Sequence, residues 1–374
     1  MRFLSCGGEL NHHGKFVCDS MYEILKDDYI RVTTQNIISD RIKLGYKEAE
    51  GLSYNLIKTD ITDDELKELV SWCDVVDYGA APIKYLNEAI KQNKIVFIRF
   101  ERLFKEGMIK LFYPPIFMRY YHKYIKHRNN PNVYFLCISA YGAADLAKIG
   151  IKGDRVLKWA YCPEFKELTD DAFEKKDEQL NLLWCGRLIK LKHPEMALKI
   201  ASQLKAINCN FSLRIVGDGD LKDSLSKQIT KLGLSDCVQL CGAVASDKVR
   251  EMMLDSDVFI ATSDKREGWG VVVNEAMSCG CAVFATKTMG AVPTLIKDGE
   301  NGFYISKGKE FEAAHIIKEL SESPTKLEAF KRAAYNTIRD GFSPDIYAKV
   351  FTDIAQEAMS GKLSSRSGLG EIAK

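Results

Sequence analysis

A regular alternation of strand-like and helix-like segments in the C-terminal half is the feature that most constrains the fold. Short apolar runs of strand length are separated by longer amphipathic segments. Parallel strands need crossover connections, so this alternation predicts a mostly parallel sheet with helices on both faces. The predicted strands are Leu182–Cys185, Phe211–Val216, Val238–Leu240, Val258–Thr262 and Ala282–Ala285, and the predicted helices lie near 194–207, 220–232, 246–255 and 271–279.

The N-terminal half repeats this alternation less regularly. The chain has 374 residues, which favours two domains. We therefore expect an α/β protein with two doubly wound, Rossmann-like domains that face a cleft, at 1–168 and 169–342. The polar segment Glu167–Gln179 is interpreted as a linker, and 363–374 as a flexible tail. The predicted N-terminal strands are Tyr29–Thr33, Asp74–Tyr78, Ile95–Phe100 and Tyr134–Ser139.

Charge and cysteine content narrow the class of protein. Lys and Arg total 53 against 51 Asp and Glu, so the chain lacks the global basic character of most nucleic-acid-binding proteins. No apolar stretch approaches a membrane span, and the N-terminus has no secretory core. The eleven cysteines form no C-x-x-C pair, which indicates reduced thiols and a cytoplasmic protein.

The first motif, Gly186–Glu195, follows one predicted strand and precedes a helix. Helix N-termini favour phosphate, and Arg187 and Lys192 add two positive charges, which suits a diphosphate; a solvated basic loop is the alternative. A second motif, Val216-Gly217-Asp218-Gly219, again joins a strand to a helix. Its glycines allow close approach of a ligand, but the motif taken alone favours an ordinary tight turn, and the pattern is not a nicotinamide fingerprint.

The third motif places two carboxylates eight residues apart, at Glu267 and Glu275, with a glycine on each side of Trp269. Eight helical residues advance about 12 Å, well beyond the roughly 5 Å that separates the carboxylates of a retaining glycosidase. We therefore expect the two side chains to contact different parts of one extended ligand. The alternative is a surface Glu267 and a solvated or capping Glu275.

These residues resemble the signature of the retaining glycosyltransferases of family four, which have the GT-B fold. The spacing of Glu267 and Glu275, the Arg187 and Lys192 element and the Val216–Gly219 turn all match, and the similarity covers roughly 180–340. The N-terminal half resembles a subgroup of bacterial surface-polysaccharide transferases through Asn11-His12-His13-Gly14, Phe100–Lys105, Ser139–Tyr141 and Lys158–Tyr161.

The resemblance implies a nucleotide-diphosphate sugar as donor, with UDP as the expected nucleotide, and no metal or other cofactor. Arg187 and Lys192 would neutralise the departing diphosphate, and Glu267 would position the sugar without acting as a covalent nucleophile. Glu275 would hold the ribose, and the helix from 343 to 362 would cross back to the first domain. The implied catalytic residues are Glu267, Arg187 and Lys192, and the implied donor-binding residues are Gly8, Gly217, Gly268, Trp269, Gly270, Val271 and Glu275.

The acceptor side is assigned to the N-terminal half, with His13, Glu101 and Arg102 as candidates. His13 follows the first strand, and a solvated loop is its alternative. Many members of the family carry a histidine after a middle strand of this domain, where this chain has Arg99-Phe100-Glu101-Arg102; Glu101 is therefore the candidate contact to the reacting hydroxyl.

Residues 99–128 combine eight Lys and Arg with two Asp and Glu, interleaved with Phe and Tyr. This composition suits an interface with anionic lipid headgroups, and acceptors in polysaccharide assembly are often lipid-linked. A solvated basic face packed on the core is the alternative. Single-stranded nucleic acid also matches this composition, but the two-carboxylate motif argues against it.

Three functions fit these motifs. The first is a retaining glycosyltransferase of capsule, exopolysaccharide or lipopolysaccharide synthesis, with a glycan or lipid-linked acceptor, in the cytoplasm or peripheral on the inner face of the plasma membrane. The second is a nucleotide-sugar 2-epimerase on the same fold, which needs no acceptor. The third is a non-catalytic nucleotide-sugar-binding protein, against which the intact Arg187, Lys192, Glu267 and Glu275 argue.

Overall fold

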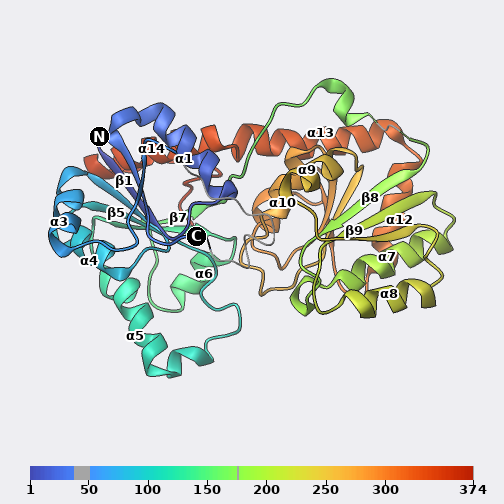
Figure 1. Cartoon of the computed structure of the whole chain (residues 1–374), viewed down its shortest axis with the longest axis horizontal. Helices are drawn as coiled ribbons and strands as arrows, with labels where there is room; N and C mark the ends of the chain where they lie inside the picture. Colours follow the sequence, from blue (N-terminus) through green and yellow to red (C-terminus); the bar gives the residue numbers. More distant parts are fainter. Residues whose placement is uncertain (38–50, 175–176, 374) are drawn as a thin grey trace. The chain divides into compact units, whose positions relative to one another are not determined.

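The computed structural model describes residues 1–37, 51–174 and 177–373 (Figure 1). The chain divides into two compact units. Unit 1 comprises Met1–Glu164 and Phe342–Lys374, and unit 2 comprises Phe165–Gly341. The division falls four residues before the domain boundary expected from the sequence, and the C-terminal segment belongs to unit 1.

The described part of unit 1 carries a seven-stranded sheet, all of whose neighbouring strands are parallel. Its strand order is β3-β2-β1-β4-β5-β6-β7, which reverses direction between β1 and β4. This is the doubly wound arrangement predicted from the sequence. The strands are β1 (Phe3–Gly7), β2 (Tyr29–Thr33), β3 (Asn55–Ile57), β4 (Val75–Tyr78), β5 (Ile95–Phe100), β6 (Val133–Ile138) and β7 (Val156–Trp159).

Helices cover both faces of this sheet (Figure 1). One face packs on an aromatic cluster around Phe351, whose ring meets Phe3, Phe97 and Trp159 edge-on at centroid distances of 5.0–5.2 Å. Ser343 caps the N-terminus of the helix that carries Phe351, as the sequence predicts, with Pro344 in the first turn. The helices in the described residues of unit 1 are α1 (His12–Leu25), α3 (Asp63–Trp72), α4 (Ile83–Lys91), α5 (Pro114–Lys123), α6 (Gly142–Ala147) and α14 (Pro344–Ser360), with the 3₁₀ turns η1 (Lys26–Asp28), η2 (Ile109–Phe112) and η3 (Ile125–His127).

Unit 2 has a six-stranded parallel sheet in its described residues, in the order β10-β9-β8-β11-β12-β13. The order reverses between β8 and β11, so ligands are expected at the carboxyl ends of these two strands. The strands are β8 (Leu180–Cys185), β9 (Phe211–Val216), β10 (Val238–Gly242), β11 (Val258–Ala261), β12 (Ala282–Thr286) and β13 (Phe303–Ile305). The helices are α7 (Pro194–Ala206), α8 (Lys222–Lys231), α9 (Ser246–Leu254), α10 (Val272–Ser278), α11 (Val292–Leu295), α12 (Glu310–Ser321) and α13 (Pro324–Gly341), with the 3₁₀ turns η4 (Asp170–Phe173) and η5 (Lys190–Lys192).

The segment interpreted as a linker packs on unit 2, and that interpretation is wrong for its described residues. Phe173 is 3% exposed, and its ring meets Tyr335 of α13 edge-on at 5.2 Å. The Tyr335 hydroxyl donates a hydrogen bond to Glu167 at 2.6 Å. The buried Phe173 ring therefore anchors on unit 2 a segment whose sequence is otherwise polar. Lys175 and Lys176 lie outside the described residues.

The predicted flexible tail is also corrected. The backbone of Gly370–Ala373 forms hydrogen bonds with β7, including one from Lys158 N to Glu371 O at 2.8 Å. Leu369 is buried, and the Lys158 ammonium pairs with Glu371 at 2.9 Å. The segment therefore covers the outer edge of the sheet. An uncovered strand edge could pair with strands of other chains. Lys374 lies outside the described residues.

All eleven cysteines are free thiols, as expected. In the described ranges, no helix is both long and apolar enough to span a membrane. The same residues contain no group of three or more His, Cys, Asp and Glu arranged to hold a metal ion.

Candidate active site

Two glycine turns meet at the carboxyl ends of β8 and β9. Leu188 N donates to Asp218 O at 2.9 Å, and Gly186 N donates to Val216 O at 3.0 Å. A Cβ on Gly217, whose φ is +139°, would lie 1.9 Å from the Gly186 carbonyl oxygen. The chain's own backbone thus fills the space that Gly217 leaves open. This accounts for the glycine by loop packing, and its contact to a donor stays a prediction.

The next loop carries an ion pair between two predicted catalytic residues. Lys192 Nζ lies 2.5 Å from Glu267 Oε2, and their side chains are only 16% and 18% exposed. Lys192 ends η5, after β8, and Glu267 follows β11. The pair therefore forms where the strand order of unit 2 reverses, the position at which ligands of doubly wound sheets bind.

Buried hydrogen bonds fix the backbone beneath this pair. The Trp184 indole N–H donates to Thr262 Oγ1 at 2.8 Å, and that hydroxyl donates to the Lys192 carbonyl at 2.6 Å. Glu267 N donates to Asp264 O at 3.0 Å, which closes a tight turn in the loop after β11. The strand ends of β8 and β11 are tied together through side chains rather than by strand pairing alone.

Trp269 anchors the glycine-rich segment after Glu267. Its side chain is 1% exposed, its indole N–H donates to Asn274 Oδ1 at 2.8 Å, and its carbonyl accepts from Ala291 N at 3.0 Å. Gly270 has φ +95°, and a Cβ there would meet the Met289 methyl at 2.5 Å. Gly268 is also buried, and the donor contact that the resemblance implies for the backbone of this segment stays a prediction.

Glu275 lies half-buried in α10, one turn after Val271, whose carbonyl accepts its N–H at 3.1 Å. Burial raises the pKa of the Cys185 thiol to about 12, with Glu275 raising it further and Lys192 lowering it. Both charged residues are therefore close enough to influence the end of β8. Arg187 is exposed in the same loop, and its guanidinium forms no ion pair within the described residues.

His193 bridges two loops, a role that the sequence did not indicate. His193 Nδ1 lies 2.8 Å from Glu195 Oε1, and Nε2 lies 3.3 Å from Asp264 Oδ2. Burial alone would raise the pKa of Asp264, but hydrogen bonds from Arg266 and His193 outweigh burial and lower it. His193 has φ +45°, a left-handed conformation that favours glycine or asparagine. The one signal in the sequence is that His193 precedes Pro194, because a residue before proline disfavours the right-handed helical conformation.

The N-terminal candidates all lie in unit 1. The His13 backbone N–H donates to the capping Asn11 Oδ1 at 3.0 Å, in the first turn of α1. Glu101 pairs with Lys105 at 2.6 Å and accepts from the Tyr161 hydroxyl at 3.1 Å. The Arg102 guanidinium stacks over Tyr141 at 4.8 Å. His13 and Glu101 are half-buried and stay acceptor candidates.

Arg102 has a structural explanation as well. Its Nε lies 3.5 Å from Asp145, whose side chain is fully buried and also accepts from Leu103 N at 3.1 Å and Phe104 N at 3.3 Å. A buried carboxylate needs partners, and Arg102 supplies one of them. Removing Arg102 would therefore disturb the loop after β5 in addition to any acceptor contact.

A second feature that the sequence did not indicate is a buried polar cluster beneath Gly7. Ser5, Arg31 and Asp77 are neighbours across β1, β2 and β4, and all are at most 5% exposed. Arg99 Nε donates to Asp77 at 2.6 Å, while a Cβ on Gly7 would meet an Arg31 nitrogen at 2.4 Å. Gly7 therefore accommodates a guanidinium. Gly8 has more room, because a Cβ there would lie 3.2 Å from its nearest neighbour, Gln35 Oε1. The donor contact predicted for Gly8 stays a prediction.

Residues 165–337 match the family model described as glycosyl transferases group 1. The D-inositol 3-phosphate glycosyltransferase of Paenarthrobacter aurescens is 27% identical over 61% of this chain and 56% of its own length. The amylovoran biosynthesis glycosyltransferase AmsK of Erwinia amylovora is 26% identical over 48% and 45%. The chain thus spans about half the length of the curated relatives it matches.

Among solved structures, Alr3699/HepE of Anabaena in complex with UDP is similar, with a TM-score of 0.69. The similarity covers 96% of this chain and 100% of that one at 16% sequence identity, which is a similarity of fold. Residues 165–337 are therefore similar to the glycosyl transferases group 1 family, and the two units of the chain have the folds seen in structures of GT-B glycosyltransferases.

Proposed function

We propose that the chain is a retaining glycosyltransferase that moves a sugar from a nucleotide-diphosphate sugar to a glycan or lipid-linked acceptor in surface-polysaccharide synthesis. The observation that carries this proposal is the Lys192–Glu267 ion pair at the strand-order reversal of a domain similar to the glycosyl transferases group 1 family. UDP is the proposed nucleotide, because the similar Alr3699/HepE structure holds UDP. The donor would come from the cytoplasm, the compartment predicted from the sequence.

The first step is neutralisation of the leaving diphosphate. As the bond from the anomeric carbon to the donor phosphate breaks, negative charge accumulates on the departing oxygen. Arg187 and Lys192 are the proposed cations for this charge, without a metal ion. The Thr262 hydroxyl holds the backbone of Lys192 through its carbonyl, and fixed charges at a developing anion typically supply a large part of enzymatic rate acceleration.

Glu267 is proposed to position the donor sugar, and Glu275 the ribose hydroxyls. Because Glu267 shares the Lys192 ammonium, an incoming diphosphate would compete with the carboxylate for the same cation. The carboxylate can then accept hydrogen bonds from sugar hydroxyls. We propose that the acceptor hydroxyl attacks on the face from which the diphosphate leaves and that its proton passes to the departing phosphate oxygen, so the anomeric configuration is retained without a protein nucleophile.

The test is turnover of UDP-, GDP- and ADP-sugars with and without glycan acceptors, with product anomers assigned by NMR. Glu267→Ala, Arg187→Ala and Lys192→Ala should each reduce transfer at least about a hundredfold, as expected for one lost transition-state contact. Lys190→Ala is the matched control, because Lys190 is an exposed cation of the same loop. EDTA should leave the rate unchanged.

Full activity in all three site variants would refute the assignment of the site. Loss of activity in EDTA that is restored by a divalent ion would refute the metal-independent mechanism. An inverted product would refute retention. Formation of a new sugar nucleotide without acceptor would instead identify an epimerase.

A further inference from the structure

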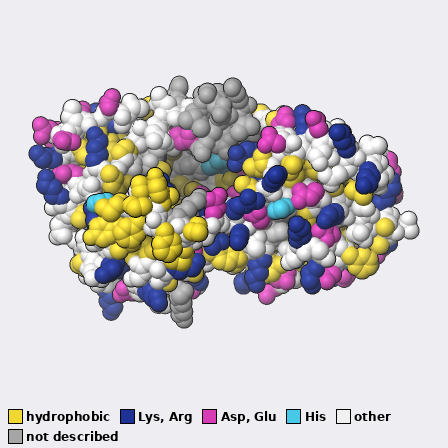
Figure 2. Space-filling model, turned by 90° about the horizontal axis from the view of Figure 1, so that it is seen from below, with side chains coloured by type: hydrophobic (Ala, Val, Ile, Leu, Met, Phe, Trp, Pro, Cys, Tyr) yellow, Lys and Arg dark blue, Asp and Glu magenta, His cyan; other side chains and the backbone are white. Residues whose placement is uncertain are grey.

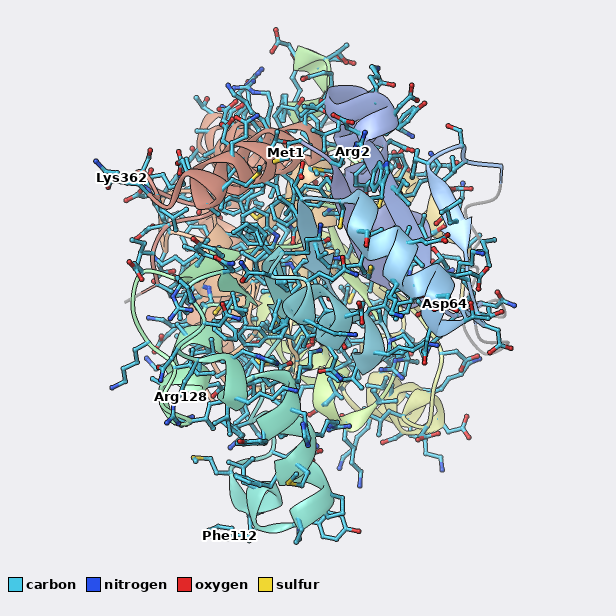
Figure 3. The ribbon with its side chains drawn as sticks, turned by 90° about the vertical axis from the view of Figure 1, so that its left-hand side faces the viewer. Met1, Arg2, Asp64, Phe112, Arg128 and Lys362 are labelled. Carbon is cyan, nitrogen blue, oxygen red and sulfur yellow. The ribbon has the colours of Figure 1, made fainter. Side chains whose placement is uncertain are left out.

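An exposed apolar surface projects from unit 1 at η2 and α5. Ile109 is 76% exposed, Phe112 87% and Tyr113 60%. Phe117, Met118 and Tyr121 extend the surface along α5 at 39–45% exposure. Figure 2 shows a broad apolar area on this side of unit 1, and Figure 3 shows Phe112 at the tip of the projection. We call these six residues the α5 surface. Large exposed apolar areas usually mark an interaction site.

The structure separates this surface from the aromatic residues that serve the core. Phe100, Phe104 and Tyr124 are only 6–7% exposed. The Tyr120 ring stacks on Phe104 at 5.9 Å, and its hydroxyl donates to the Leu103 carbonyl at 3.0 Å. One side of α5 is therefore fastened to the fold, while the opposite side carries the α5 surface. The sequence shows that this segment is rich in aromatic residues, but it does not show which of them pack in the core and which form the exposed surface.

The part of the α5 surface that lies on the helix is ordered. Pro114 and Pro115 occupy the first turn of α5, which restricts the backbone directly after Tyr113. Phe117 and Tyr121 stack on each other at 6.3 Å, one helical turn apart. A surface that is already ordered loses little conformational entropy when it binds, which favours a binding role over a loose loop.

Positively charged residues lie in the same stretch of the chain as the α5 surface. From Met108 to Arg128 the sequence has five Lys and Arg and no Asp or Glu. Arg119, Lys126 and Arg128 are exposed. Lys123 differs, because its ammonium lies 5.0 Å from the Tyr78 ring centre and donates to the Gly79 carbonyl at 3.4 Å. The exposed cations are therefore available to contact a ligand, whereas the Lys123 ammonium is engaged in contacts within unit 1.

We propose that the α5 surface inserts its apolar residues into the interface of an anionic lipid bilayer, with the exposed cations of the same segment against the headgroups. Aromatic side chains flanked by Lys and Arg are the composition that interfacial segments use. A second copy of this chain fits poorly, because its identical cations would oppose these ones across the contact. The proposal does not depend on the transferase assignment, since vesicle binding requires no sugar transfer.

The test is co-sedimentation of the full chain with vesicles of phosphatidylcholine alone or mixed with phosphatidylglycerol. We expect binding to the mixed vesicles that weakens as salt rises. Phe112→Ser combined with Phe117→Ser should reduce the partition coefficient at least about tenfold, because two apolar anchors are lost. Phe311→Ser is the matched control, since Phe311 is 56% exposed in unit 2 and should have no effect.

A second variant tests the charge. Arg119→Gln with Arg128→Gln should reduce binding to mixed vesicles roughly tenfold or more, since each cation near such a surface contributes a factor of about five. Unchanged binding in the Phe112 and Phe117 variant would overturn the proposal. So would concentration-dependent dimerisation of the wild-type chain that this variant abolishes, because the surface would then bind a second copy. Normal donor hydrolysis by both variants would show that transferase chemistry and membrane contact are separate.

Discussion

Lys192 and Glu267 form an ion pair that, in the proposed function, would affect how tightly the donor binds. Both side chains are less than one-fifth exposed, so their attraction is screened less than that of a surface pair. A diphosphate that displaces Glu267 gains a strong cation but leaves a half-buried carboxylate that needs new donors. Sugar hydroxyls are such donors. A donor that carries a sugar should therefore bind more tightly than the nucleotide diphosphate alone would suggest.

His127 allows a pH prediction at the same scale. The residue is 5% exposed and its Nε2 lies 3.1 Å from the His122 carbonyl oxygen. Burial, assisted by Lys126, lowers the pKa of His127 to about 4 from 6.5. Between pH 6.5 and 4 the unfolded chain therefore takes up a proton that the folded chain does not, and stability is lost as the pH falls through that range.

The measurement is urea unfolding of wild type and His127→Gln from pH 7 to pH 4. The free energy of unfolding of wild type relative to the variant should fall by on the order of 2 kcal/mol over this range. His122→Gln, which replaces an exposed histidine nearby, should follow the wild-type profile. Parallel wild-type and His127→Gln profiles would mean that His127 accepts a proton in the folded state.

At the scale of elements, the sequence located the strands but not the contacts that assemble them. The predicted strands Phe211–Val216, Tyr29–Thr33 and Ile95–Phe100 agree with β9, β2 and β5 to the residue, because each is a short run rich in apolar and β-branched or aromatic residues. The short strands β3, β7 and β13 were not predicted. β3 and β13 have three residues each, which are too few positions for a periodic signal.

The candidate site shows the same division. Residue type and spacing identified Lys192 and Glu267, but nothing in the spacing places them 2.5 Å apart. That distance depends on the adjacency of β8 and β11, a property of the sheet order. Arg31 and Asp77 lie in separate strands of an apolar sheet, and only the pairing of β1 with both strands shows that they belong to one cluster.

His193 provides the prediction for this scale, because it joins the start of α7 to the loop that carries Glu267. His193→Gly should relieve the left-handed strain, roughly 1 kcal/mol, while removing the bridge from Glu195 to Asp264. We expect unchanged or higher thermal stability with donor turnover reduced several-fold. His193→Asn tolerates the conformation and keeps one hydrogen-bonding arm, so its turnover should be intermediate. Wild-type turnover in His193→Gly would show that the bridge does not position Glu267.

At the scale of the whole molecule, the order of the chain makes the two units unequal. The chain leaves unit 1 at Glu164 and returns at Phe342, so unit 2 is one continuous segment while unit 1 needs both ends of the chain. Helix α14 closes unit 1 by packing on α1, where Ser20 Oγ donates to Asp345 at 2.6 Å. The sequence suggested a returning helix only through resemblance, since its apolar face does not specify its partner.

Two matched core truncations test this inequality. Phe351→Ala removes a 1% exposed ring that meets Phe3, Phe97 and Trp159, and Phe284→Ala removes a fully buried ring stacked on Phe303 at 4.7 Å. Each loss should cost about 3–5 kcal/mol, a decrease on the order of 10 °C in the melting temperature of the unit affected. Hydrogen exchange should show faster opening of β1 and β5 in Phe351→Ala, with β8 and β12 unchanged, and the reverse in Phe284→Ala. If either variant accelerated exchange equally in both sheets, the two units would unfold as one cooperative body, and the independence of the continuous unit would be refuted.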